Sequence, residues 1–369
     1  MANICYIGNV ASHYRKSIFV KMSETFDIDF LFGDSLWDIK QMDTTLLHGK
    51  VIKTKLKYLV GGWHWHEGVL SLLKQPYEKY ILISDSRSLS TWMFCIIARL
   101  FFRNKIIFFW SHGWYGKETR IESFLKKIYM RLPNGGIFLY GNYARSLMIK
   151  EGFNPDKLFT IHNSLDYNRQ LDLRINLTGS LLFENHFGNN NRNLIFVGRL
   201  TKIKHLDLIL DAMRLSKNDG VDYNLTLVGD GVMRPFLEEK TQELGLMDNV
   251  WFYGACYDEQ QLSTLIYNAD LCVSPGNVGL TAIHSLMFGT PVITHNDFKW
   301  QMPEFEAIRD NETGAFFEYN NSASLCLTIN NWFCNHKNRD IVRKNCYREI
   351  DNYWTPEFQI SVLKQHIQD

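Results

Sequence analysis

The stretch that decides the fold covers residues 193–204 and reads NLIFVGRLTKIK. Its first part, Asn193–Val197, is a short apolar run typical of a buried strand, and Gly198 stands where that strand would end. A helix-length amphipathic segment, Leu206–Ser216, follows. A buried strand, a glycine turn and a helix make up the repeating unit of a parallel α/β sheet.

The same unit recurs on both sides of this stretch. Later strand-like runs are Asn224–Val228, Val250–Tyr253, Leu271–Ser274 and Pro291–Thr294, and earlier ones are Ile4–Ile7, Ile28–Phe32, Tyr80–Ile83, Lys105–Trp110 and Gly136–Tyr140. The rhythm fails only near 168–192, in a polar, Gly/Asn-rich stretch. We therefore predict an α/β protein of two doubly wound Rossmann-like domains facing across a cleft. Their predicted bounds are 1–168 and 193–350, with a linker at 169–192 and a C-terminal helix at 351–369 that packs back toward the first domain.

Composition excludes several classes of protein. A chain of 369 residues with 46% hydrophobic content can build two full cores. The formal net charge of +1 excludes a general nucleic-acid binder, although residues 1–168 carry +8 and residues 169–369 carry −7, as expected for domains with different partners. The seven cysteines form no Cys-x-x-Cys pair. With no basic leader and no unbroken apolar span, we expect a cytoplasmic protein.

Three glycine loops follow strands in the second half. Gly198 is followed by the cations Arg199 and Lys204, Gly229 begins a Gly-Asp-Gly turn, and residues 274–281 read SPGNVGLT. Backbone N–H groups in such loops bind phosphate, and the carboxyl ends of parallel strands meet at one edge of a sheet. The three loops together predict a phosphate site, whereas each one alone could be a solvated turn.

The order of these motifs resembles glycosyltransferase family four (glycosyl transferases group 1), whose members have the GT-B fold. The likeness continues through Gly289-Thr290-Pro291-Val292-Ile293, Pro303-Glu304 and Thr313-Gly314, and upstream through Ile161–Asp166. It implies an N-terminal acceptor-binding domain and a C-terminal domain that binds a nucleotide-sugar.

The resemblance also implies roles for single residues. Arg199 and Lys204 would hold the donor diphosphate, and His112, in Ser111-His112-Gly113, would lie near the reacting sugar; these three are the candidate catalytic residues. The candidate donor-binding residues are Gly198, Gly229, Asp230, Tyr253, Gly254, Gly276, Asn277, Val278, Gly279, Leu280, Thr281, His284 and Glu304. Tyr253 and Gly254 would border the base, and Thr281 would meet the phosphates.

The sequence departs from the family at one motif. The family usually carries a Glu, seven residues and a second Glu, and here those positions hold Gly276 and His284. We expect Asn277 or Glu304 to compensate for the first carboxylate, and His284 to hydrogen-bond the ribose hydroxyls in place of the second. The departure leaves the donor and the activity itself open.

The acceptor side is less specific. Residues 8–15 read GNVASHYR, which lacks the GxGxxG spacing of dinucleotide dehydrogenases and offers His13, Tyr14 and Arg15 as acceptor contacts. Residues 61–66 read GGWHWH, and Trp63 and His64 are further candidates because aromatic faces stack on sugar rings; a buried aromatic cluster is the alternative. The His-x-His pair lacks a third ligand, so we expect no metal site.

Two basic clusters lie in the first half, at Lys53, Lys55 and Lys57 and at Lys126, Lys127 and Arg131. Such clusters are usually solvated faces, but beside apolar residues they could bind anionic lipid headgroups at the inner face of a membrane.

The resulting hypothesis is a retaining transferase that needs no metal or other cofactor. It would move sugar from a nucleotide-sugar donor to a glycan or lipid-diphosphate-linked acceptor in surface polysaccharide or glycoconjugate synthesis. The alternatives are a nucleotide-sugar epimerase of the same fold and a degenerate sugar-nucleotide-binding subunit.

Overall fold

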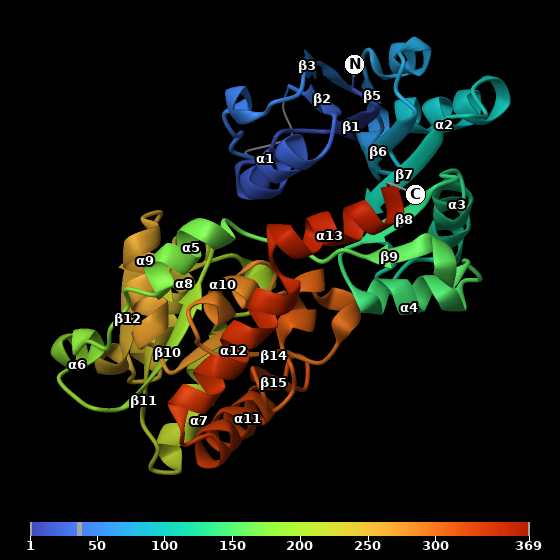
Figure 1. Cartoon of the computed structure of the whole chain (residues 1–369). Helices are drawn as coiled ribbons and strands as arrows, with labels where there is room; N and C mark the ends of the chain where they lie inside the picture. The colour runs from blue at the N-terminus through green and yellow to red at the C-terminus, as the bar shows by residue number, and fades with distance from the viewer. Residues whose placement is uncertain (1, 35–38, 368–369) are drawn as a thin grey trace. The chain divides into compact units, whose positions relative to one another are not determined.

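The structure, a computed structural model, describes residues 2–34 and 39–367 and consists of two compact units (Figure 1). One unit contains Met1–Asp166 together with Thr355–Asp369, and the other contains Tyr167–Trp354. The segment 169–192, for which the sequence predicts a linker, carries two helices of the second unit, α5 (Tyr167–Arg174) and α6 (Leu182–Phe187).

The first unit is built on a seven-stranded parallel sheet of order β3-β2-β1-β6-β7-β8-β9. Its strands are β1 (Ile4–Gly8), β2 (Ile28–Gly33), β3 (Val51–Thr54), β6 (Lys79–Ile83), β7 (Ile106–Ser111), β8 (Gly136–Leu139) and β9 (Leu158–Thr160). The central strands are buried along nearly their whole length, which is why they consist of apolar runs. A small antiparallel ribbon pairs β4 (Leu56–Tyr58) with β5 (His64–His66).

Helices cover both faces of this sheet. The strands after β1 are joined by right-handed crossovers, so α2 (Leu89–Phe101), α3 (Arg120–Met130) and α4 (Asn142–Lys150) share one face. The opposite face packs against α1 (Lys16–Thr25) and α13 (Pro356–Ile367), whose Ile360, Leu363 and Ile367 are buried beside Phe19 and Phe138. The last helix thus completes the core of the first unit.

The second unit has a six-stranded parallel sheet of order β12-β11-β10-β13-β14-β15. Its strands are β10 (Arg192–Val197), β11 (Tyr223–Val228), β12 (Val250–Gly254), β13 (Leu271–Ser274), β14 (Val292–His295) and β15 (Gly314–Phe317), and its remaining helices are α7 (Asp207–Asn218), α8 (Arg234–Glu243), α9 (Glu259–Asn268), α10 (Thr281–Met287), α11 (Ser322–Asn335) and α12 (Arg339–Tyr353). The crossovers out of β12 and β13 run the same way across the sheet, which places α9 and α10 on one face. Both sheets are doubly wound, as predicted.

Candidate nucleotide-sugar site

The three glycine loops of the second unit are hydrogen-bonded to one another at the carboxyl edge of the sheet. The Gly198 N–H donates to the Val228 carbonyl at 2.9 Å, and the Gly229 N–H donates to the Gly254 carbonyl at 2.8 Å. The Gly276 N–H donates to the Lys204 carbonyl at 2.9 Å. The loops that the sequence predicts to meet are therefore joined through their backbones.

Two of these contacts leave no room for a side chain. A Cβ added at Gly229 would lie 1.9 Å from the Gly198 carbonyl oxygen. A Cβ at Gly276 would lie 2.0 Å from the carbonyl oxygen of Ile203 and 2.7 Å from the Cα of Lys204. The absence of the family's first glutamate thus has a steric cause, because the turn Lys202–Lys204 packs directly on position 276.

Lys204 reaches across this contact to the next residue of the loop. Its Nζ donates to the backbone carbonyl of Asn277 at 2.6 Å and to the Asn277 Oδ1 at 2.9 Å. Burial lowers the pKa of Lys204 to about 8; the negative charge of Glu304 opposes this shift and the positive charge of Arg199 adds to it. Glu304 is itself buried, on the turn Pro303–Ala307, and Arg199 is exposed. Two cations thus lie close enough to repel each other, as expected where an anion binds between them.

The loop 276–281 offers backbone donors beside these cations. The Val278 N–H donates to Gln301 Oε1 at 2.9 Å, whereas the N–H groups of Gly279 and Leu280 have no acceptor among the residues that the structure describes. The Thr281 hydroxyl donates to the Val197 carbonyl at 3.0 Å, so toward a phosphate it can only accept. Free N–H groups in a glycine loop suit an anionic ligand.

His284 has a partner that the sequence does not reveal. Its Nε2 lies 2.9 Å from Oε1 of Glu259, the first residue of α9, and that oxygen also accepts from Gln170 Nε2 at 2.8 Å. Burial would raise the pKa of Glu259, but its hydrogen bonds with His284 and Gln170 lower it below the usual value. A carboxylate is therefore present beside position 284, brought there by a different helix.

Tyr253 and Gly254 lie at the end of β12. The Tyr253 hydroxyl donates to Gln261 Oε1 at 3.2 Å, and its ring lines a cavity of about 340 Å³ against the first turns of α9. Asp230 accepts the N–H of Gly231 at 2.7 Å, which stabilises the second glycine loop. Both positions belong to the same edge as Gly198.

In the first unit, Arg15 lies on the short turn after β1, and His112 directly follows β7. Both residues are therefore at the carboxyl edge of the sheet. The ring of His112 packs on Tyr140 with centroids 4.6 Å apart. Burial, with the charges of Arg15 and Lys126, lowers the pKa of His112 to about 4, so the imidazole is neutral at pH 7. Its Nδ1 has no hydrogen-bond partner within residues 2–34 and 39–367. A half-buried, neutral histidine with an unpaired nitrogen in the described structure suits a contact with a sugar hydroxyl.

Arg15 is buried, and among the residues that the structure describes no carboxylate lies at ion-pair distance from it. It is 5% exposed, its guanidinium carbon lies 4.4 Å from the ring centroid of Trp110, and Nη1 donates to the Tyr6 hydroxyl at 3.1 Å. Its Nη2 has no partner in the part of the chain that the structure describes. A buried cation whose contacts within the described residues are aromatic rings and a phenol suits an external anion. The adjacent His13 and Tyr14 are exposed.

A cavity of about 670 Å³ lies at the same end of the first unit. It is lined by Trp63, Ser86, Arg87, Trp92, Tyr115, Lys117, Glu118, Glu122, Leu125 and Lys126. Trp63, a candidate acceptor contact, lines this cavity, together with Arg87, Trp92 and Tyr115, which the sequence analysis does not single out. Arg87 does carry a signal, because it follows the strand run Tyr80–Ile83 by a few residues.

His64 is placed differently from Trp63. It is buried in β5, packs on Tyr58 with ring centroids 5.9 Å apart, and does not line this cavity. His66 accepts or donates a hydrogen bond with Thr54 Oγ1 at 2.7 Å, and burial together with the charge of His64 lowers its pKa to about 4. For His64 the structure favours the buried aromatic cluster over an acceptor contact.

The two doubly wound sheets and the joined glycine loops are typical of the GT-B class of nucleotide-sugar enzymes. Residues 181–349, somewhat less than half of the chain, match the family model "Glycosyl transferases group 1". This match confirms the resemblance to that family over most of the second unit.

Two relatives align with parts of the chain. A GDP-mannose-dependent alpha-(1-6)-phosphatidylinositol dimannoside mannosyltransferase of Mycobacterium tuberculosis is 35% identical over 103 residues, which are 27% of this chain and 26% of that protein. An uncharacterized 41.2 kDa protein in the cps region of Klebsiella pneumoniae is 28% identical over 182 residues, 48% of this chain and 46% of that protein. The alignments thus span about a quarter and about half of these relatives.

The fold matches over the whole length. Alr3699/HepE of Anabaena, solved with UDP, covers 100% of both chains with a TM-score of 0.72 and 14% identity; the same protein with UDP-glucose gives 0.67. This likeness confirms the predicted fold class of two Rossmann-like domains. Within the described residues, none of the helices combines the length and apolar character that crossing a bilayer requires.

Proposed function

We propose that the whole chain is a glycosyltransferase that moves a sugar from a nucleotide-sugar donor to a glycan or a lipid-diphosphate-linked acceptor. The observation that carries the proposal is the pair Arg199 and Lys204 at the edge where three glycine loops join. The relatives support it, since one is a GDP-mannose-dependent mannosyltransferase and the Anabaena protein was solved with UDP and with UDP-glucose. The cps-region relative favours a role in surface polysaccharide or glycoconjugate synthesis.

In the proposed reaction the bond between the sugar and the diphosphate oxygen breaks. The electron pair stays on the diphosphate, whose growing charge Arg199 and Lys204 would stabilise without a metal ion. The acceptor hydroxyl forms the new bond to the sugar and gives its proton to an oxygen of the departing diphosphate. By its family resemblance, the enzyme would retain the anomeric configuration.

The donor's other contacts would come from the same edge. The N–H groups of Gly279 and Leu280 would meet the phosphates or sugar, and Tyr253 would border the base. In this proposal Glu259, oriented by His284, supplies the carboxylate that the family normally carries at position 284. The ribose hydroxyls would be its ligand.

The acceptor would bind in the 670 Å³ cavity of the first unit. Trp63, Trp92 and Tyr115 offer aromatic faces for a sugar ring, and Arg87 and Lys117 offer positive charge for a diphosphate. Arg15 and His112 would contact the reacting groups from the strand ends.

The test is release of nucleoside diphosphate from UDP-glucose, GDP-mannose and related donors, with a short-prenyl diphosphate-linked N-acetylglucosamine as acceptor. We expect release only when the acceptor is present, together with a hexose added to the acceptor and no effect of EDTA.

Isomerised donor without acceptor would identify an epimerase instead. Donors that raise the melting temperature but never turn over would indicate a binding subunit. Activity lost in EDTA and restored by Mn²⁺ would overturn metal independence.

The pKa of Lys204 predicts a pH dependence. The protonated ammonium binds the diphosphate, and with a pKa of about 8 it is lost as the pH rises through that value. We therefore expect kcat/KM for the donor to be full below pH 8 and to fall above it, since this ratio reports the free enzyme. Lys204→Arg keeps its charge at every such pH and should shift the fall to higher pH. An unchanged profile in this variant would assign the fall to another group.

A further inference from the structure

Helix α3 turns an apolar stripe toward solvent. Ile121, Phe124, Leu125 and Ile128 follow the spacing of one helix face, and they are 74%, 64%, 50% and 43% exposed. The helix is joined to the core of the first unit by Tyr129 and Met130, which are buried. Such a stripe normally faces the core, so its exposure indicates a surface that is covered in use.

The neighbouring helix α2 continues this apolar surface. Its inner side, with Phe94, Cys95 and Ala98, is buried. Its outer side carries Met93, Ile96 and Leu100, and Phe101 follows at 75% exposure. A helix that is apolar on all sides is unusual outside a protein core or a membrane.

The outer sides of α2 and α3 are turned the same way. Helices α2 and α3 cover the same face of the sheet (Figure 1). The ring centroids of Trp92 and Tyr129 lie 5.0 Å apart. Side chains directed away from that sheet therefore point to the same side of the unit. We call this surface the α2/α3 face; it comprises Met93, Ile96, Leu100, Phe101, Ile121, Phe124, Leu125 and Ile128.

Positive charge surrounds the α2/α3 face. Residues 89–131 hold eight Lys and Arg against two Glu, a net charge of +6. Arg99, Arg103 and Arg120 are exposed, and in the described part of the chain no carboxylate lies at ion-pair distance from them. These cations are therefore available to an anionic partner.

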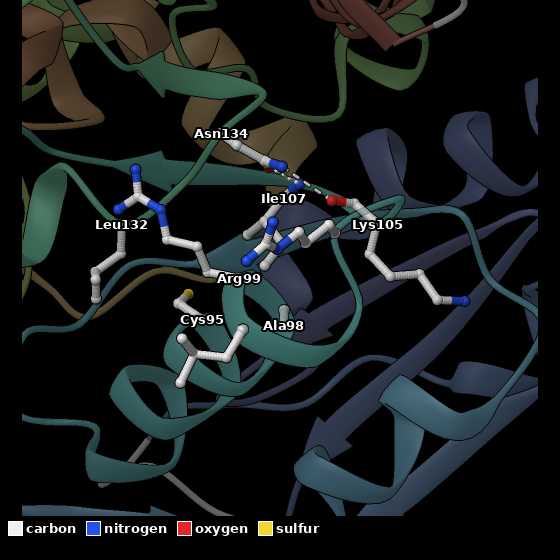
Figure 2. A pocket seen from close by; sticks show the side chains of 9 residues that line it. Cys95, Ala98, Arg99, Lys105, Ile107, Leu132 and Asn134 are labelled. Atoms are coloured by element: carbon white, nitrogen blue, oxygen red, sulfur yellow. Dashed lines mark hydrogen bonds between the residues drawn. The ribbon is translucent and has the colours of Figure 1, made fainter.

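Two of the arginines line a cavity of about 410 Å³ at the end of α2 (Figure 2). Its wall includes Cys95, Ala98, Ile107 and Leu132, with Arg99 and Arg103 beside them. The other polar groups are occupied: Asn134 Oδ1 accepts the Ile107 N–H at 2.7 Å and its Nδ2 donates to the Lys105 carbonyl at 2.9 Å, while Lys105 Nζ donates to the Gln75 carbonyl at 3.0 Å. Neither guanidinium group makes a hydrogen bond or an ion pair within the described ranges of the chain. An apolar cavity with two such groups fits the phosphate and first acyl carbons of a phospholipid.

We propose that the α2/α3 face binds the surface of an anionic phospholipid bilayer. Its apolar side chains would enter the headgroup and acyl boundary, and Arg99, Arg103 and Arg120 would lie among the phosphates. A second copy of the chain fits less well, because pairing this face with itself would bring like charges together. The inference rests on the proposed function in one respect: Leu125 also lines the acceptor cavity, so a lipid-linked acceptor could enter it from the bilayer.

The experiment is flotation of the full chain with vesicles of phosphatidylcholine alone or mixed with phosphatidylglycerol. We expect binding to the mixed vesicles roughly tenfold or more above the neutral ones, and a weakening with salt. Phe124→Ser with Ile128→Ser should lose at least about tenfold of this binding, because two exposed apolar groups are removed. Arg99→Gln with Arg103→Gln should lose the preference for anionic lipid.

The matched control is Leu327→Ser with Ile341→Ser, which removes two side chains of similar exposure, 62% and 58%, from α11 and α12. This variant should bind as wild type does. Equal vesicle binding by Phe124→Ser with Ile128→Ser and by the control would overturn the proposal, as would no binding by wild type. A concentration-dependent dimer that the α3 variant abolishes would assign the face to self-association instead. Transfer to the short-prenyl acceptor in detergent-free solution should be unchanged in the α3 variant, so failure of this inference is distinguishable from failure of the proposed function.

Discussion

We expect the Lys204→Met variant to transfer sugar on the order of 10²-fold more slowly than wild type, with little change in its free energy of unfolding. The charge that Lys204 would neutralise appears on the diphosphate as the sugar leaves, so the loss should fall on kcat as well as on kcat/KM. Methionine keeps the length and the apolar stem of the lysine side chain. Because it carries no charge, burying it does not incur the desolvation that lowers the pKa of Lys204. Single-turnover rates and thermal unfolding of the purified variant measure the two effects.

Lys202 provides a matched control for this variant. It lies on the same short turn, Lys202–Lys204, but it is exposed and makes no ion pair within residues 2–34 and 39–367. Lys202→Met removes the same charge two residues away and should keep near-normal turnover. Equal losses of turnover in both variants would show that any positive charge on this turn contributes, and not Lys204 specifically. Normal turnover in Lys204→Met would show that the diphosphate binds elsewhere.

The central strands could be predicted from sequence because they are buried on both faces. Leu271–Ser274 is a strand with the predicted bounds, and Ile28–Phe32 and Asn224–Val228 differ from β2 and β11 by one residue. The strands that were missed are mostly at edges or short: β3, at one edge of its sheet, is only partly buried and includes the exposed Lys53. Such strands lack a continuous apolar run, so periodicity gives no signal.

Sequence alone could predict only those contacts of the site that follow from the parallel order of the strands. The three glycine loops meet as expected, since parallel topology brings them to one edge. The pairing of His284 with Glu259 depends on the packing of α9 beside α10, which sequence spacing does not encode. The exposed face of α3 has the same limitation, because a stripe of period 3.6 does not indicate whether it faces the core or solvent.

Restoring the family's glutamate at position 276 should lower the transfer rate strongly rather than raise it. In Gly276→Glu, and already in Gly276→Ala, the new Cβ would lie 2.0 Å from the Ile203 carbonyl oxygen and 2.7 Å from the Lys204 Cα. Both are backbone atoms and cannot rotate away, so the turn that carries Lys204 must move. Such overpacking costs about 1–3 kcal/mol of unfolding free energy. A displacement of Lys204 by about 1 Å would lower the rate by roughly 10²-fold.

The control for Gly276→Ala is Gly179→Ala. A Cβ at Gly179 meets no atom within 4 Å, and its backbone is not in the left-handed region, so the same methyl group should leave stability and rate near wild type. Urea unfolding and single-turnover transfer on both variants test the idea. If Gly276→Ala keeps wild-type stability and rate, the contact between the turn and the loop is looser than the structure shows. The glycine would then be free to change, and its presence would have to be explained by the ligand rather than by packing against Lys204.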